Sequence, residues 1–146
     1  MTAINNKDKM AAKTALEVLL NVLPKSGRGI QDIAYLVGLI CRETGVPVEQ
    51  ATDIIMSWSE RLRALTNFKE LFPSQRKLSF YRYRVRYSVQ SAYKRVQAQP
   101  SPRSFLDLTG QEAPAASFWA KLPAPKTKRK PAKRNNTPED ISEKSS

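Results

Sequence analysis

The chain of 146 residues carries 25 Lys and Arg against 13 Asp and Glu, which gives a formal net charge of +12. It has one cysteine, Cys41, and no histidine, so it can form neither a disulfide framework nor an ordinary zinc site. The lack of histidine also removes the commonest general base. These counts argue against an enzyme, and we expect no catalytic residue, metal, cofactor or small-molecule substrate.

The charge is unevenly distributed along the chain. Residues 1–70 hold nine Lys and Arg and eight Asp and Glu, whereas residues 71–146 hold sixteen and five. This division is typical of a scaffold that carries a polyanion-binding surface. No apolar run approaches the ~20 residues of a membrane span, and no signal peptide is recognisable. We therefore expect a soluble protein, cytoplasmic or nucleoid-associated, or nuclear in a eukaryotic or viral setting.

Amphipathic patterns in the first half of the chain predict a bundle of three helices. Each segment carries apolar residues at spacings of three and four, and prolines and glycines separate the segments. The middle segment is apolar nearly all round, which is typical of the central helix of a small bundle. The predicted helices span residues 7–23, 30–44 and 48–65.

Two residues and one loop in this half could have a functional role, and each is assigned a structural one. Cys41 lies on the buried arc of the second helix, so we expect an inert thiol. Trp58 lies on the inward stripe of the third helix and is predicted to anchor the core. The loop at residues 25–29 has two glycines but lacks the Gly-Lys-Ser/Thr ending of a P-loop, so a plain connector is predicted.

Residues 40–55 match the spacing of a helix-turn-helix. Ile40 and Cys41 take the buried positions before a Gly-Val-Pro turn. In that motif the second helix lies in the DNA major groove and its exposed residues read bases. Two of those residues are acidic here and would be repelled by phosphate, so a helical hairpin that binds no DNA stays open. The residues concerned are Val48, Glu49, Gln50, Thr52 and Asp53.

The densest set of cations lies between residues 75 and 99. No Asp or Glu occurs between Glu70 and Asp107, and five aromatic residues stand among the cations. Dense Lys and Arg displace counterions from a phosphate backbone, and rings offer faces on which bases stack. We therefore predict a nucleic-acid-binding segment. Its candidate site residues are Arg76, Lys77, Arg82, Tyr83, Arg84, Arg86, Tyr87, Lys94 and Arg95, together with Arg103 further along the chain.

Two periodicities compete in this segment. A strand would place alternating tyrosines and valines on one face and Arg82, Arg84 and Arg86 on the other. A helix would form an apolar stripe from Leu78 to Val96. The stripe outlasts the alternation, Ser74 suits an N-cap, and Pro100 closes the segment. We therefore predict a long helix of about 24 residues over 74–97, with its arginines spread round the exposed arc.

The composition changes again after Pro100. We divide the chain into a helical nucleic-acid-binding domain at 7–100, a connector at 101–110, and a disordered tail rich in Pro and Lys at 111–146. The tail has too little apolar surface to offset the entropy of ordering. Phe118 and Trp119 are an exception, and docking on the helical domain is favoured over a partner motif because an exposed Phe-Trp pair invites aggregation.

The tail holds a second cluster of cations. The run KTKRKPAKR at 126–134 matches a nuclear-localisation pattern in a eukaryotic or viral setting. In a bacterial or phage setting it is a basic arm that raises non-specific affinity. The sequence leaves both open. The tail residues assigned to the candidate site are Lys126, Lys128, Arg129, Lys130, Lys133 and Arg134.

Part of the second half resembles the ProQ/FinO family of RNA chaperones. The likeness rests on Tyr87, Tyr93, Arg103 and the run Leu-Asp-Leu-Thr-Gly at 106–110, in the family's order of Tyr, Tyr, Arg and Asp-Leu-x-Gly. The resemblance implies that these residues belong to a concave, basic RNA-binding face. The interval from Arg103 to Gly110 is longer than in that family, which is a departure from its pattern. The resemblance keeps RNA as the alternative target.

Together these patterns predict an all-α fold: a small helix-turn-helix-like bundle with an extra long basic helix and a disordered basic tail. We expect a non-enzymatic regulatory or accessory protein that binds nucleic acid, with DNA favoured because of the helix-turn-helix spacing. The first alternative is an RNA chaperone or translational regulator. The second is a phage- or plasmid-type adaptor that binds an acidic host protein. In each case a second copy of the chain is a candidate partner.

Overall fold

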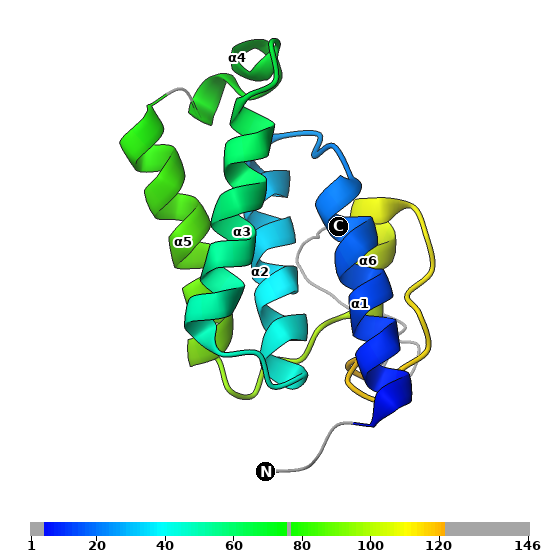
Figure 1. The fold of residues 1–146 in the computed structure, drawn as a ribbon. Helices are drawn as coiled ribbons and strands as arrows, with labels where there is room; N and C mark the ends of the chain where they lie inside the picture. Colours follow the sequence, from blue (N-terminus) through cyan, green and yellow to red (C-terminus); the bar gives the residue numbers. More distant parts are fainter. Residues whose placement is uncertain (1–4, 76, 122–146) are drawn as a thin grey trace, which may run out of the picture.

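The computed structural model describes residues 5–75 and 77–121, and within these ranges every regular element is helical. The predicted all-α bundle is confirmed. α2 lies in the middle, with α3 and α5 on one side and α1 and α6 on the other (Figure 1). The elements are α1 (Asn6–Asn21), α2 (Gly27–Glu43), α3 (Val48–Arg63), α4 (Phe68–Leu71), the 3₁₀ helix η1 (Pro73–Gln75), α5 (Leu78–Lys94) and α6 (Pro102–Thr109).

The apolar surface of α2 makes it the core helix. Ten of its residues are buried, from Gly27 to Cys41, and they cover most of the helix circumference, whereas Arg28 and Asp32 are exposed. It starts three residues before the predicted Ile30 because the Ser26 hydroxyl caps it, accepting the Gly29 N–H at 3.2 Å. Burial raises the pKa of the Cys41 thiol to about 11, which agrees with an inert core thiol.

Gly38 lets α5 approach α2 closely. A Cβ atom at this position would lie 2.8 Å from the Cβ of Ala92 and 3.0 Å from the carbonyl oxygen of Val89. Side chains cannot approach so closely without a shift of one helix. The absence of a side chain at Gly38 therefore sets the distance between the two helices.

A short turn joins α2 to α3. Gly45 adopts a φ of 82°, and the Val46 N–H donates to the Cys41 carbonyl at 2.9 Å, which closes the end of α2. The two helices then run side by side in opposite directions (Figure 1). The predicted helix–turn–helix connection is therefore present, and it takes the form of a helical hairpin on which α5 packs.

α5 confirms the predicted helix and excludes the strand alternative, but it is shorter than predicted. It has 17 residues and buries Tyr81, Val85, Ser88 and Ala92 of the expected stripe. Val89 is buried in addition, whereas Val96, the predicted end of the stripe, lies beyond the helix and is exposed. The start at Ser74 is corrected, because residues 73–75 form η1 and Lys77 takes the position before α5 without a side-chain cap. The end at residue 97 is corrected to Lys94.

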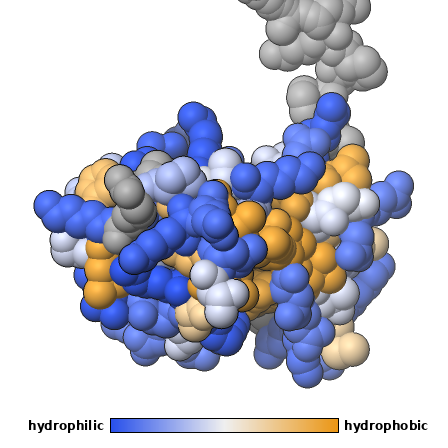
Figure 2. Space-filling view, turned by 90° about the horizontal axis from the view of Figure 1, so that it is seen from above, coloured by the Kyte–Doolittle hydropathy of each residue, from blue (hydrophilic) through white to orange (hydrophobic). Residues whose placement is uncertain are grey.

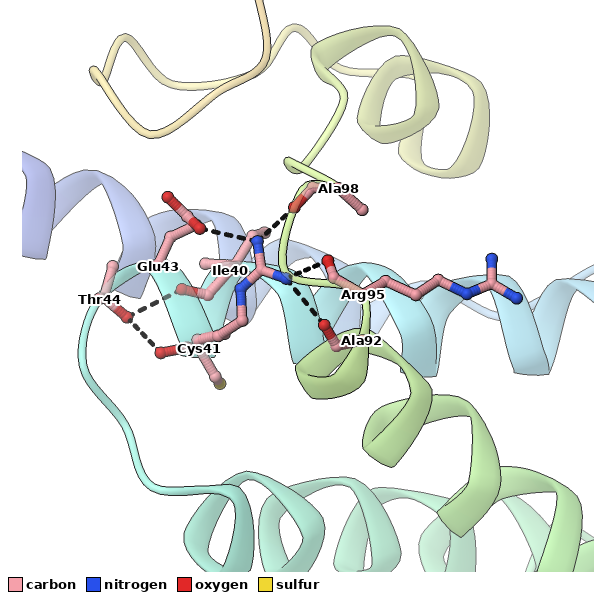
Figure 3. Close-up of polar contacts among 8 residues, drawn as sticks. Ile40, Cys41, Glu43, Thr44, Ala92, Arg95 and Ala98 are labelled. Atoms are coloured by element: carbon pink, nitrogen blue, oxygen red, sulfur yellow. Dashed lines mark hydrogen bonds and ion pairs between the residues drawn. The ribbon is translucent and has the colours of Figure 1, made fainter.

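Arg42 accounts for the early end of α5. Its Nη1 donates to the carbonyl oxygens of Ala92 at 2.8 Å and Arg95 at 2.7 Å, and its Nη2 donates to the Ala98 carbonyl and the Glu43 carboxylate. Figure 3 shows these acceptors grouped round one guanidinium at the end of α5. The last carbonyls of a helix have no intrahelical donor. Arg42 supplies one, and the chain turns away toward α6.

The structure corrects the predicted connector at 101–110, which forms α6. The Ser101 hydroxyl accepts the Ser104 N–H at 3.2 Å, Pro102 takes the first helical position, and Gly110 ends the helix with a φ of 74°. These residues favour the two ends of a helix. Ser101, Pro102 and Gly110 therefore indicate the two ends of a helix and not a loop.

The segment after α6 packs on the bundle. Ser117 donates to the Asp8 carboxylate in the first turn of α1, from its backbone N–H at 3.1 Å and from its hydroxyl. Trp119 packs edge-on against Phe105 of α6 with ring centroids 5.6 Å apart, and Phe118 beside it is also buried. The aromatic pair therefore docks. The folded unit extends to residue 121 rather than ending at 100, because these rings supply apolar surface that the composition of the whole tail conceals.

Some of the predicted organisation lies outside the described residues. This applies to the disorder predicted for the tail beyond residue 121, to Arg76, and to the cations at 126–134. Within the ranges that are described, no helix is both long and apolar enough to span a bilayer.

Replacement of Arg42 by Met is expected to destabilise the bundle by about 1–3 kcal/mol, since partly buried carbonyls lose a charged donor while the stem volume is kept. Chemical denaturation measures this change. Arg103→Met is the matched control, because the Arg103 guanidinium is exposed and pairs with Asp107 one helical turn away. It should change the free energy of unfolding by at most ~0.5 kcal/mol. Equal effects of the two substitutions would contradict the role given to Arg42.

The docked segment is expected to loosen in acid. Hydrogen bonds from Ser117 hold the pKa of the Asp8 carboxyl below its ordinary value of 3.8. Such a group stabilises the fold above its unfolded pKa and loses this contribution as the pH falls through the folded value. Below pH 3.8 the emission of Trp119 should therefore shift to the red. Asp8→Asn should abolish this part of the pH profile, whereas the surface change Asp32→Asn should leave it; identical profiles would contradict the assignment.

Candidate nucleic-acid interface

The exposed arc of α5 carries three aromatic rings in a row. Phe80, Tyr83 and Tyr87 follow at intervals of three and four residues, so they share one helix face. Their exposed fractions are 44%, 59% and 54%. The rings of Tyr83 and Tyr87 stack at a centroid distance of 5.9 Å and an interplanar angle of 23°. This set, which we call the aromatic row, exposes large apolar faces that the core does not use, as expected of a binding surface.

The two remaining rings of α5 face inward and hold the helix in place. Tyr81 is fully buried, donates from its hydroxyl to the Ser59 carbonyl at 2.7 Å, and packs edge-on against Phe68. Burial raises the pKa of Tyr81 to about 12. Tyr93 donates to the carbonyl of Val46 in the turn between α2 and α3, and desolvation raises its pKa.

The positions of the α5 tyrosines test the predicted likeness to RNA chaperones. That likeness requires Tyr87 and Tyr93 on one concave face. The structure places Tyr87 on the exposed arc and directs the Tyr93 hydroxyl to Val46, so the two rings are not brought together. The row on α5 therefore has to be judged by its own geometry.

Cations surround the aromatic row. The Arg84 guanidinium lies over the Phe80 ring, 5.0 Å from its centroid, and that of Arg95 lies 5.7 Å from the ring of Tyr35. Neither they nor the exposed Lys77, Arg86 and Lys94 form an ion pair within the described part of the chain. Uncompensated cations are available to phosphate. The free set consists of Lys77, Arg84, Arg86, Lys94 and Arg95.

Arg82 and Arg103, both predicted site residues, are engaged in ion pairs. Arg82 donates to both oxygens of Glu60 on α3, from Nε at 3.0 Å and from Nη2 at 3.1 Å. This pairing holds the pKa of the Glu60 carboxyl below its ordinary range and raises that of Arg82. Arg103 pairs with Asp107 on α6 at 3.4 Å. Arg82 therefore links α5 to α3, and its charge is partly balanced.

Two other surfaces lack the features of α5. The predicted DNA-reading residues at the start of α3 present the exposed carboxylates of Glu49 and Asp53 and no cation. Seen from above, apolar side chains are exposed in a hollow between two hydrophilic halves of the molecule (Figure 2). At this end, a cavity of about 200 Å³ between α1 and α3 is lined by apolar side chains together with Asn21 and Arg61, and Leu23 and Leu65 are exposed. Neither surface offers a set of phosphate ligands.

No family model, no curated protein and no solved structure matches the chain. Among residues 5–75 and 77–121, no three Cys, Asp or Glu side chains gather as a metal site would require. The exposed arc of α5 is therefore the candidate interface. The sequence analysis did not include Phe80 among the site residues, although its exposure follows from its spacing to Tyr83 and Tyr87. It could not find Glu60, which is 22 residues from Arg82.

Alanine substitutions should separate the inward rings from the aromatic row. Tyr81→Ala removes a fully buried ring and is expected to lower the free energy of unfolding by about 3–5 kcal/mol. Tyr83→Ala and Tyr87→Ala remove exposed rings and should each change it by at most ~0.5 kcal/mol. Thermal and denaturant unfolding provide the measurement. A large loss for Tyr83→Ala or Tyr87→Ala would assign the exposed rings to the core.

Proposed function

We propose that the protein binds single-stranded nucleic acid across the exposed arc of α5, as a non-enzymatic regulatory or accessory protein. The observation that carries this proposal is the aromatic row set among cations that have no carboxylate partner in the described part of the chain. Bases stack on exposed rings with a gain of about 1–3 kcal/mol each, whatever their sequence. Phosphates between the bases pair with the flanking cations.

The geometry favours a single strand over a duplex. Rings can stack only on bases whose faces are accessible, and a duplex buries those faces between neighbouring pairs. From Phe80 to Tyr87 the row extends for about 10 Å along the helix, room for two or three bases. The start of α3, which would enter the groove of a duplex, presents two carboxylates. DNA and RNA strands both offer base faces and phosphates, so both belong to the proposed ligand class.

Binding of labelled strands tests this proposal. Fluorescence anisotropy should show tighter binding of single-stranded DNA or RNA than of duplex DNA by the full chain. The double variant Tyr83→Ala/Tyr87→Ala should weaken single strands by about 1–3 kcal/mol per ring and leave duplex affinity nearly unchanged. Arg84→Ala/Arg86→Ala should lower the log–log salt slope on single strands by about 0.7 per lost contact.

Arg103→Ala is the control for charge. It removes one positive charge from α6, where the guanidinium is already paired with Asp107, and should keep both affinity and salt slope. If the ring variant binds single strands as tightly as the native protein, the aromatic row is not the stacking surface. If no nucleic acid binds near physiological salt, an adaptor that places this face on an acidic protein becomes the favoured function.

A further inference from the structure

A second cationic feature lies beyond the aromatic row, where α3 ends. The turn after α3 borders a cavity of about 290 Å³. Its polar lining groups are a guanidinium, an ammonium and a hydroxyl, and its other walls are apolar. None of its described lining residues is acidic. The residues are Arg63, Leu65, Thr66, Phe68 and Lys69.

Two aromatic rings hold the Arg63 guanidinium at this cavity. Its carbon lies 5.5 Å from the ring centroid of Phe68 and 6.0 Å from that of Tyr81, which is within cation–π range. This arrangement limits the positions of a side chain that is otherwise flexible. The cation is therefore oriented before any ligand arrives.

Arg63 lacks a partner for its hydrogen bonds. Its Nη1 is buried without one and is the one side-chain nitrogen or oxygen of this kind in residues 5–75 and 77–121. Glu60, one turn earlier on α3, is bound by Arg82. A buried donor of a charged group is costly to leave unpaired. An acceptor at this place would remove that cost.

Local backbone acceptors do not fill this role. The carbonyl oxygens of Glu60 and Leu62 accept the N–H of Ala64, and that of Leu65 accepts the N–H of Phe68 at 3.2 Å. These bonds close the end of α3 and the turn that follows. The side chains of Arg63, Thr66 and Lys69 bring donors to this cavity, which is the chemistry of an anion site.

We propose that this cavity binds a phosphate group through Arg63, Thr66 and Lys69. The N–H groups of the guanidinium can donate to phosphate oxygens, and the buried Nη1 has to be uncovered to take part. The Thr66 hydroxyl and the Lys69 ammonium donate from the turn and from α4. The volume exceeds that of a phosphate alone and leaves room for part of the ester that carries it. The ligand is free phosphate or a phosphate of a nucleic-acid strand, and the site does not depend on the function assigned to α5.

Two assays on the full chain test the site. In the first, melting temperature is compared in inorganic phosphate and in chloride at equal ionic strength, since a ligand of the folded state raises it. In the second, the salt slope for a single-stranded oligonucleotide is measured. The variants are Arg63→Met and Lys69→Met. Arg61→Met is the matched control, an exposed arginine of the same helix that lines the cavity between α1 and α3 instead.

A rise in melting temperature with phosphate that Arg63→Met and Lys69→Met lose and Arg61→Met keeps would establish a site for free phosphate. No such rise, with a salt slope lowered by about 0.7 in the two variants alone, would identify a strand phosphate as the ligand. If both variants match Arg61→Met in both assays, the proposal is overturned. Lys69 is exposed and outside the core, so Lys69→Met decides the matter even if Arg63→Met fails to fold.

Discussion

The apolar circumference of α2 is the constraint on which the rest of the structure depends. A helix with apolar residues on most of its sides has to be covered on most of its sides, and α3 and α5 cover one side while α1 and α6 cover the other. Gly38 permits the closest of these approaches, that of α5. At the end of the same helix, Arg42 binds the last carbonyls of α5 and determines where that helix stops. One helix therefore constrains the positions of its neighbours and the length of α5.

In this arrangement most of the surface of α5 is not packed against the other helices. Only a narrow stripe of α5 contacts α2 and α3, and the remaining arc holds three exposed rings and a series of cations. Arg82 and Arg86 lie one turn apart, where like charges cost about 0.2–0.5 kcal/mol. Arg82 links α5 to α3 through Glu60, whereas the three exposed rings and Arg86 take no part in the packing of the described bundle. Tyr81 also joins this arc to the cavity after α3, since its ring lies beside the Arg63 guanidinium while its neighbours in sequence face solvent.

Much of the fold could be predicted from the sequence, because helices depend on local spacing. The first three helices lie within three residues of their predicted bounds, and four members of the predicted stripe on α5 are buried: Tyr81, Val85, Ser88 and Ala92. α6 could also have been predicted, since Ser101, Pro102 and Gly110 favour helix ends. For the candidate site, the sequence indicated the basic and aromatic segment, but it left open whether Tyr83 and Tyr87 face solvent or the core.

The sequence by itself determined which residues could be inside each helix, because a period of 3.6 residues is a local property. Only the tertiary structure decided which cations are free. Arg82 meets Glu60, Arg42 meets the carbonyls that end α5, and Arg63 meets two rings and no acceptor. The docking of Ser117 on Asp8, 109 residues away, belongs to the same class. Such pairings form when separate helices close round a shared core, and no periodicity along the chain specifies which distant side chains then come within hydrogen-bond distance.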